Sequence, residues 1–502
     1  MSQRQTIVSA PGKVLLAGGY LVLDRAYTGL VVATSSRFYA SVSDVPAGAA
    51  SVPTSSFPSA STSVAATPAG SGRATPQRVK SARVSVTAGQ FPKDASTWAY
   101  DVVFAGENAP KLVPAHEARN KFVEVTLSNV LLYAGERLGR DGLARKLGAG
   151  LDVVVLANND FYSQREQLAA ANLPPRLESL AALEPFCPLP RPIGNTNKTG
   201  LGSSAALVTS LVAALLQHLG LADVASAADR DEIHSLAQAA HCLAQGKVGS
   251  GFDVASAVYG THVYRRFSPS VLEPLFNGTG SVLSVVRSDA WDTEQRPFRL
   301  PRGLRMMLAD VDAGTDTPSF VGKVLAWRKD KPEEAKKLWD RVDESNRELE
   351  ACLAALVDAE KEPSYDQVIA EAASRPITEL SDGKVEALLK RTRDAILRVR
   401  AGMQAMSSAS GVAIEPVEQT RLLDTCSACP GVLGGGVPGA GGYDAVWVLA
   451  LDAKAPVASV ETVWGGWSEM SVCPLSARQS DGGLQLEMSQ AVPGLAARLS
   501  PA

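Results

Sequence analysis

The chain is poor in several features that would point to particular classes of protein. Its 502 residues contain only six cysteines, too few for a disulfide framework in a chain of this length. No apolar run approaches the ~18 residues needed to cross a bilayer, and the first residues, MSQRQTIVSAPGK, lack the apolar core of a secretory signal. A net charge of −3 provides no overall basic surface for nucleic acid. We therefore expect a soluble cytoplasmic protein that binds neither a membrane nor nucleic acid, and no obligate protein partner is evident.

The length and the residue pattern indicate two domains of the α+β class. A chain of 502 residues exceeds what one hydrophobic core usually supports. Short strand-like runs such as TIVSAP and AVWVLAL occur between long apolar or amphipathic helical stretches. We place the boundary near residue 300, which defines domains at 1–300 and 301–502. Residues 46–76 are almost all Pro, Ala, Gly, Ser or Thr and bury too little apolar surface to fold, so we interpret them as a disordered low-complexity insertion.

The most informative segment is NKTGLGSSAA (197–206), which leads into an apolar helix that ends near Gly220. Gly200 and Gly202 allow a tight turn and a close approach of the backbone to a ligand. The two serines that follow begin the helix, whose N–H groups and positive dipole end favour an anion, and Lys198 adds a positive charge. The pattern differs from the Walker motif and from a dinucleotide G-x-G-x-x-G. It predicts a phosphate-binding loop, although a glycine-rich helix N-cap without a ligand would have the same composition.

Two further glycine-rich segments must be explained together with this loop, SAPGKVLLAGGYLVL from Ser9 and GVPGAGGYDA from Gly436. The set resembles the GHMP kinases, which include galactokinase, homoserine kinase, mevalonate kinase and phosphomevalonate kinase. Within that family, the sequences of these segments most resemble those of the eukaryotic phosphomevalonate kinases. The shared blocks are APGKVLLAGGYLVL, NDFYSQR, KTGLGSSAA, AHCLAQGKVGSGFDVASAVYG, TPSFVGKVLAWRK and GVPGAGGYDA. They span nearly the whole chain outside residues 46–76.

The resemblance implies a fold and a set of cofactors. The expected GHMP kinase fold is an N-terminal domain with a left-handed βαβ crossover and a C-terminal ferredoxin-like domain, with ATP and the acceptor in the cleft between them. The implied cofactors are ATP and Mg²⁺, with Ser204 as a magnesium ligand. The residues expected at the ATP phosphates are Lys198, Thr199, Gly200, Leu201, Gly202, Ser203, Ser204 and Ala205. The adenine is expected near Asn159, Ser163 and Gln164.

Two residues are implied by the resemblance as catalytic: Asp253 in GSGFD and Lys13 in APGK. A phosphate acceptor has a second pKa of about 6, so it is mostly a dianion at neutral pH and gains little from a base. We therefore expect Lys13 to neutralise the two anions that must meet, and Asp253 to orient the lysine and the acceptor. General-base catalysis by Asp253 remains a secondary role, and a helix N-cap is the structural alternative.

A phosphorylated acceptor also needs cations and small groups around it. The expected acceptor-binding residues are Lys13, Lys247, Ser250, Arg265, Ser319, Gly439, Ala440, Gly441 and Gly442. Arg266 is an alternative to Arg265, and both also fit a solvated strand end. Ser319 and the third glycine-rich turn also fit ordinary turn positions.

One departure from the family concerns magnesium. The segment AAHCLAQ places His241 and Cys242, but no carboxylate, where mevalonate kinase carries a magnesium-binding glutamate. Magnesium prefers oxygen ligands, so a second ligand stays unassigned. The resemblance implies transfer of the ATP γ-phosphoryl group to 5-phosphomevalonate, giving 5-diphosphomevalonate and ADP in the mevalonate route to isoprenoids and sterols. The alternatives are mevalonate kinase or another GHMP small-molecule kinase, diphosphomevalonate decarboxylase, and an inactive regulator with this fold.

Overall fold

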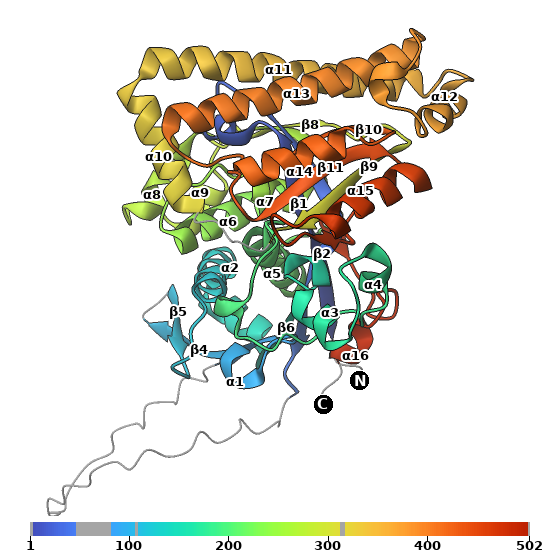
Figure 1. Ribbon diagram of the computed structural model, residues 1–502. Coiled ribbons are helices and arrows are strands. Elements are labelled where there is room, and N and C mark those ends of the chain that lie inside the picture. Colours follow the sequence, from blue (N-terminus) through green and yellow to red (C-terminus); the bar gives the residue numbers. More distant parts are fainter. Residues whose placement is uncertain (1–3, 47–81, 106–108, 312–316, 500–502) are drawn as a thin grey trace, which may run out of the picture.

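The structure, a computed structural model, describes residues 4–46, 82–105, 109–311 and 317–499 (Figure 1). The strands are β1 Gln5–Ala17, β2 Gly29–Asp44, β3 Ala82–Ala88, β4 Thr97–Ala105, β5 Ala109–Pro114, β6 Gly150–Ala157, β7 His262–Arg265, β8 Glu294–Pro297, β9 Leu304–Asp310, β10 Val432–Gly436, β11 Ala445–Leu451, β12 Cys473–Leu475, β13 Gln479–Ser480 and β14 Gln485–Leu486. The α-helices are α1 Lys93–Ser96, α2 Lys121–Leu147, α3 Arg165–Ala170, α4 Leu177–Ala181, α5 Ser203–Leu219, α6 Ala227–Gln245, α7 Phe252–Tyr259, α8 Glu273–Phe276, α9 Val282–Val286, α10 Thr317–Asp330, α11 Pro332–Ala359, α12 Tyr365–Ala372, α13 Lys384–Ser410, α14 Val417–Ser427, α15 Lys454–Gly466 and α16 Leu495–Leu499. Five short 3₁₀ helices are also described, η1 Gly19–Leu23, η2 Asn159–Phe161, η3 Ile193–Asn195, η4 Pro269–Leu272 and η5 Ile377–Glu379. The predicted α+β class is confirmed, and the insertion predicted at 46–76 lies, apart from Pro46, outside the described residues.

A ten-stranded sheet forms the body of the first half. Its main path runs β14-β1-β2-β6-β3-β4-β5; β7 and β13 pair with β2, and β8 pairs with β7. The long strands β1 and β2 pair antiparallel, with shifts in register between Pro11 and Lys13 and between Leu15 and Ala17. Strands β3 and β6 are parallel neighbours, and the chain passes through β4, β5 and α2 between them, as a parallel pair requires a long connection.

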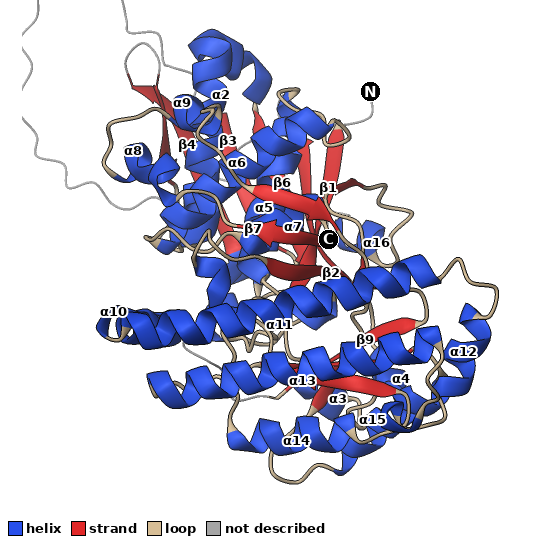
Figure 2. Cartoon of the chain, turned by 90° about the horizontal axis from the view of Figure 1, so that it is seen from above, coloured by secondary structure: helices blue, strands red, loops and turns tan. Residues whose placement is uncertain are grey.

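The second sheet has four strands in the order β10-β11-β9-β12, and each neighbouring pair is antiparallel. Helices α10 to α14 lie between β9 and β10 in the chain, and α15 lies between β11 and β12. This β-α-β-β-α-β arrangement is that of a ferredoxin-like domain. The long amphipathic helices α11 and α13 lie side by side in both views (Figures 1 and 2).

The chain does not keep to one sheet in each half. The second sheet begins at Leu304, close to the predicted boundary at 300. Near the C-terminal end, however, β13 pairs with β2 and β14 pairs with β1, so residues 479–486 return to the first sheet. The two-domain division at 300 therefore remains a prediction about folding units.

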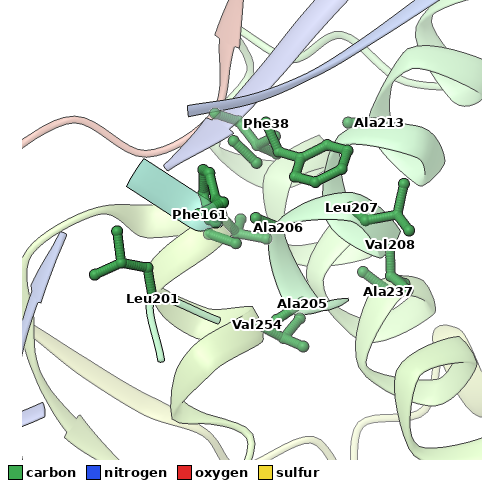
Figure 3. Packing of buried hydrophobic residues seen from close by; sticks show 14 of the residues in the cluster. Phe38, Phe161, Leu201, Ala205, Ala206, Leu207, Val208, Ala213, Ala237 and Val254 are labelled. Atoms are coloured by element: carbon green, nitrogen blue, oxygen red, sulfur yellow. The ribbon is translucent and has the colours of Figure 1, made fainter. Parts of the chain in front are cut away.

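Helix α5 positions the predicted phosphate loop because it is buried nearly all round. Its apolar sequence packs into the main core, and Figure 3 shows Leu201, Ala205 and Val254 among the buried side chains at its start. Such a helix is held by tertiary packing on every face. It ends at Leu219 with Gly220 in the left-handed conformation, which confirms the predicted end. Among the described residues, no helix is both long and apolar enough to cross a membrane.

Candidate active site

One cleft is lined by residues from all three glycine-rich segments. Its walls include Lys13 and Gly19 from the first segment, Gly200 and Gly202 from the second, and the stretch 438–441 from the third. The loop before α7 and the face of α10 complete it. The expected site residues that line this cleft are Lys13, Gly200, Gly202, Lys247, Ser250, Asp253, Gly439, Ala440 and Gly441.

The phosphate loop has the backbone that its sequence predicts. Gly200 and Gly202 have φ values of 77° and 80°, a region that favours glycine. Gly202 is the N-cap residue of α5 and offers no side-chain acceptor to the first N–H groups of the helix. Thr199 is buried and its hydroxyl donates to the carbonyl of Asp160, which anchors the loop from behind. The start of α5 is therefore arranged to receive an anion.

The remaining residues of this loop divide by exposure. Leu201 and Ala205 are buried in the core and can contribute only their backbone to a ligand. Ser203 and Ser204 are half-buried in the first turn of α5, and the side chain of Lys198 is exposed. Binding of the ATP phosphates by this set remains a prediction.

Lys13 is fixed against the phosphate loop by its backbone and its ammonium group. Its N–H donates to the carbonyl of Leu201 at 3.0 Å, and Nζ donates to the carbonyl of Gly200 at 2.7 Å. Burial lowers the pKa of Lys13, while the nearby carboxylates of Asp253 and Asp444 oppose this shift. The lysine side chain therefore lies at the floor of the cleft, between the loop and two acidic side chains.

Asp253 lies in the first turn of α7. Gly251 is the N-cap, with φ of 84°, and a side chain there would collide with Gln238, Tyr264 and Phe267. Asp253 is thus not the N-cap; one of its carboxylate oxygens accepts from the N–H of Val254 at 3.0 Å. The other lies 4.0 Å from Nε2 of His241. The carboxylate faces the cleft with Lys13, as the catalytic assignment requires.

The two arginines considered as acceptor ligands, Arg265 and Arg266, differ in their position relative to the cleft. Arg265, at the end of β7, pairs with Glu294 at 3.0 Å and donates to the carbonyl of Arg25, so the structure does not bring it to the cleft. Arg266 lines the cleft, but its guanidinium donates to the backbone carbonyls of Leu23, Val248 and Gly249. It holds the loop that carries Lys247 and Ser250.

Of the other residues expected to bind the acceptor, some line the cleft and some lie behind or beside it. Lys247 is exposed on the cleft wall, and Ser250 is half-buried there. Gly442 donates its N–H to the carbonyl of Ile414 at 2.8 Å, behind the turn that faces the cleft. Ser319 is exposed in the first turn of α10, while Val321 and Leu325 of the same helix line the cleft.

The residues expected near the adenine lie on the segment that pairs with Lys198 through Tyr162. The amide of Asn159 is used within the fold, because it donates to the carbonyl of Glu184 and accepts from the N–H of Cys187. Ser163 Oγ and Gln164 Oε1 are buried and have no hydrogen-bond partner within the described chain. These two atoms are available to bind the adenine, so that prediction stands untested, whereas the side chain of Asn159 has a structural role.

Three further residues at the cleft, Tyr20, His241 and Asp444, had no role predicted from the sequence. Asp444 lies beside the phosphate loop, with its Cβ 3.8 Å from the position that a Cβ on Gly200 would take. The hydroxyl of Tyr20 donates to the carbonyl of Ala440 at 2.7 Å and joins the first and third segments. His241 contacts both Ser204 and Asp253. Asp444 lies within the third glycine-rich segment, two residues after Gly442, and that position was the available signal in the sequence.

Comparison with known proteins decides the family. A family model described as the GHMP kinases N terminal domain matches residues 190–261, which include the phosphate loop and Asp253. A peroxisomal phosphomevalonate kinase of Arabidopsis thaliana is 35% identical over 519 aligned residues, which cover 96% of each chain. A phosphomevalonate kinase of Aspergillus fumigatus is 37% identical, with 92% of this chain and 90% of that protein covered. The chain belongs to the phosphomevalonate kinases of the GHMP family.

The architecture agrees with this assignment. A phosphomevalonate kinase of Streptococcus pneumoniae, solved in complex with phosphomevalonate and AMPPNP, matches with a TM-score of 0.55 at 14% identity and covers 94% of this chain and 99% of its own. That match shows a shared GHMP kinase fold. The resemblance inferred from the sequence is thus confirmed, and this phosphomevalonate kinase family member is an ATP-dependent phosphotransferase.

Proposed function

We propose that this enzyme transfers the γ-phosphoryl group of ATP to the phosphate of 5-phosphomevalonate, giving 5-diphosphomevalonate and ADP. The observation that carries the proposal is the juxtaposition of Lys13, Asp253 and the phosphate loop in one cleft of a chain whose relatives are phosphomevalonate kinases over nine-tenths of its length. In the reaction, an acceptor phosphate oxygen forms a bond to the γ-phosphorus. The bond from that phosphorus to the β,γ-bridging oxygen breaks, and its electron pair leaves with ADP.

Transfer of the phosphoryl group to a phosphate acceptor depends more on charge neutralisation than on removal of a proton. Because the acceptor phosphate is mostly a dianion at neutral pH, its attacking oxygen needs no base. Two polyanions must nevertheless approach one another, and repulsion between them is the main obstacle. Lys13, held between the phosphate loop and two carboxylates, would lower that repulsion in the ammonium form. Asp253 would keep the ammonium group and the acceptor aligned.

The donor atoms of the site fit a magnesium ion that is held mainly by the nucleotide. Among the described residues, no cluster of three or more His, Cys, Asp and Glu side chains could hold a metal. Hard oxygen donors are present in the Ser204 hydroxyl and the Asp253 carboxylate, and Mg²⁺ usually keeps several waters and binds through one or two protein groups plus phosphates. Mg²⁺, when bound with ATP, would neutralise charge on the β- and γ-phosphates. Ser204 is the residue we propose as its protein ligand.

An acceptor panel tests the proposed function directly. ADP release, measured in a coupled assay, should be far faster with 5-phosphomevalonate than with mevalonate, galactose or homoserine. Omission of Mg²⁺ should abolish turnover, and addition of excess EDTA should do the same. A preference for any unphosphorylated acceptor would contradict the proposal, and turnover without an acceptor would indicate an ATPase.

The cytoplasmic location expected from the sequence also stays within this proposal. The name of the Arabidopsis relative places that protein in peroxisomes. Fractionation of the native source, with a peroxisomal and a cytosolic marker followed in parallel, would test the expectation.

A further inference from the structure

His241 is a buried polar residue near the C-terminal end of α6, a helix that also buries apolar side chains and the polar residues His234, Ser235 and Gln238. It lies on α6, is 2% exposed, and has Ala239, Ala240 and Cys242 as buried neighbours in sequence. Its ring packs against Phe122, with 5.8 Å between the ring centroids. An imidazole in such a place costs desolvation free energy unless its nitrogens have partners. Its partners therefore indicate why the residue is there.

The partners of His241 belong to the two helices that carry the chemistry. Nε2 lies 3.1 Å from Oγ of Ser204, in the first turn of α5. The same nitrogen lies 4.0 Å from a carboxylate oxygen of Asp253, in the first turn of α7. The side-chain amide of Gln245, one turn further along α6, lies 3.4 Å from it. One ring nitrogen thus reaches both the end of the phosphate loop and the acid.

Neither first turn has another such support from its own N-cap. The N-cap residues of α5 and α7 are Gly202 and Gly251, which have no side chain and lie in left-handed conformations. Without side chains, these glycines provide no side-chain cap that could hold the residues following them. His241, on a third helix, lies close to both Ser204 and Asp253.

We propose that His241 is a positioning residue that holds the Ser204 hydroxyl and the Asp253 carboxylate in register across the floor of the cleft. The inference rests on the proposed function in one respect: Ser204 is assigned to the side of ATP, and Asp253 to the side of the acceptor. His241 acts through these two groups, because its side chain is almost entirely covered. Displacement of either group by a fraction of an ångström to 1 Å would slow phosphoryl transfer without abolishing binding.

The test compares two near-isosteric replacements of His241 with the same replacements at a matched control. His241→Gln keeps a polar terminus at the reach of Nε2, whereas His241→Met has a similar length and no hydrogen-bonding equivalent. His234 is the control, because it lies two turns earlier on α6, is 3% exposed, and packs on Tyr259 and Trp291. Its Nε2 has no partner within the described residues. His234→Gln and His234→Met therefore test the replacement of a buried α6 histidine away from the contacts of His241 with Ser204 and Asp253.

We expect His241→Met to lower kcat by about 10- to 100-fold, the range for a misplacement of reacting groups by up to about 1 Å. KM for ATP and for the acceptor should change by less than about 3-fold, since binding groups are retained. His241→Gln should recover kcat to within about 5-fold of wild type. The His234 variants should lower the melting temperature without changing kcat by more than about 2-fold.

Equal kcat losses in His241→Met and His234→Met, or no recovery in His241→Gln, would overturn the proposal. If His241→Met does not fold, His241→Asn replaces it, because the shorter amide is polar but cannot reach Ser204; full activity of that variant would equally overturn it. Binding of a fluorescent ADP analogue, measured without turnover, should be nearly unchanged in all folded variants. Each variant is compared with wild type using the best acceptor from the panel, so failure of the proposed function would appear in wild type and failure of this inference only in the variants.

Discussion

The two glycine-rich turns that line the cleft use glycine for different reasons. In the phosphate loop, Gly202 has φ of 80°, and a Cβ there would meet the flexible side chain of Lys13 at 3.0 Å from Cε. In the third segment, Gly441 has φ of 71°, and a Cβ there would collide with the backbone carbonyl of Ile414. The first glycine makes room for a functional side chain, and the second makes room for the fold. The comparison teaches that one glycine-rich turn leaves space for a side chain that lines the cleft, whereas the other leaves space for the backbone of a neighbouring segment.

The largest effect is expected for Lys13 and Asp253, which lie beside the phosphate loop. Lys13→Met and Asp253→Ala should each lower kcat by at least ~100-fold, the scale for loss of a key electrostatic group. The melting temperature should stay within a few degrees of wild type, because both groups face the cleft. Steady-state kinetics with a parallel thermal melt checks this. Near-normal kcat in either variant would remove that residue from the mechanism and weaken the contrast between the two turns.

The next prediction addresses the two glycines themselves. Gly441→Ala should destabilise the fold by more than about 2 kcal/mol, because left-handed strain of about 1–2 kcal/mol adds to a backbone collision. Gly202→Ala should cost only the strain, but should lower kcat by about 10-fold or more by displacing Lys13. Urea titration and kinetics of both variants decide the matter. Loss of stability alone in Gly202→Ala, with normal kcat, would break the comparison.

A third prediction concerns Lys247 and tests which of the two substrates this residue binds. Lys247→Ala should raise KM for the phosphorylated acceptor by about 10-fold or more, the effect of losing one charge-assisted hydrogen bond, while KM for ATP changes little. Lys198→Ala is the matched control and should affect ATP instead. Equal KM changes for both substrates in Lys247→Ala would mean that the lysine only stiffens its loop.

The smallest expected effect is a shift in pH dependence. The pKa of Lys13 is lowered by burial, so a mechanism that needs the ammonium form loses activity as pH rises through a value below the ordinary 10.5. Asp444 raises this pKa, so Asp444→Asn should move the basic limb of the kcat/KM profile to lower pH. Lys13→Arg should remove the limb, whatever activity it retains. An unchanged limb in both variants would assign the titration to another group.

Much of this site could be predicted from local sequence, because its main parts are turns and helix starts. The left-handed glycines at 200 and 202, and the helix from Ser203 to Leu219, follow from composition and apolar pattern. The two arginines could not be separated in this way. Arg265 and Arg266 are adjacent, so their side chains point in different directions, and the register of β7 against β8 sets Arg265 opposite Glu294.

Other features depended on contacts between distant segments. His241 was visible only as a missing carboxylate until α5, α6 and α7 were brought together around it. Asn159 was expected at the adenine because of its motif, but the partners that occupy its amide, Glu184 and Cys187, come from a later loop. The return of β13 and β14 to the first sheet had no strong signal, since each strand is only two residues long.

The measurement that tests the central claim most directly is ³¹P NMR of the reaction mixture with ATP, Mg²⁺ and 5-phosphomevalonate. The account predicts that the phosphomonoester signal declines as two coupled diphosphate signals grow, in equal amount to the ADP formed. The same experiment with Asp253→Ala should show neither change over the same time. Accumulation of ADP with an unchanged phosphomonoester signal, or the appearance of a second phosphomonoester, would contradict transfer to the acceptor phosphate.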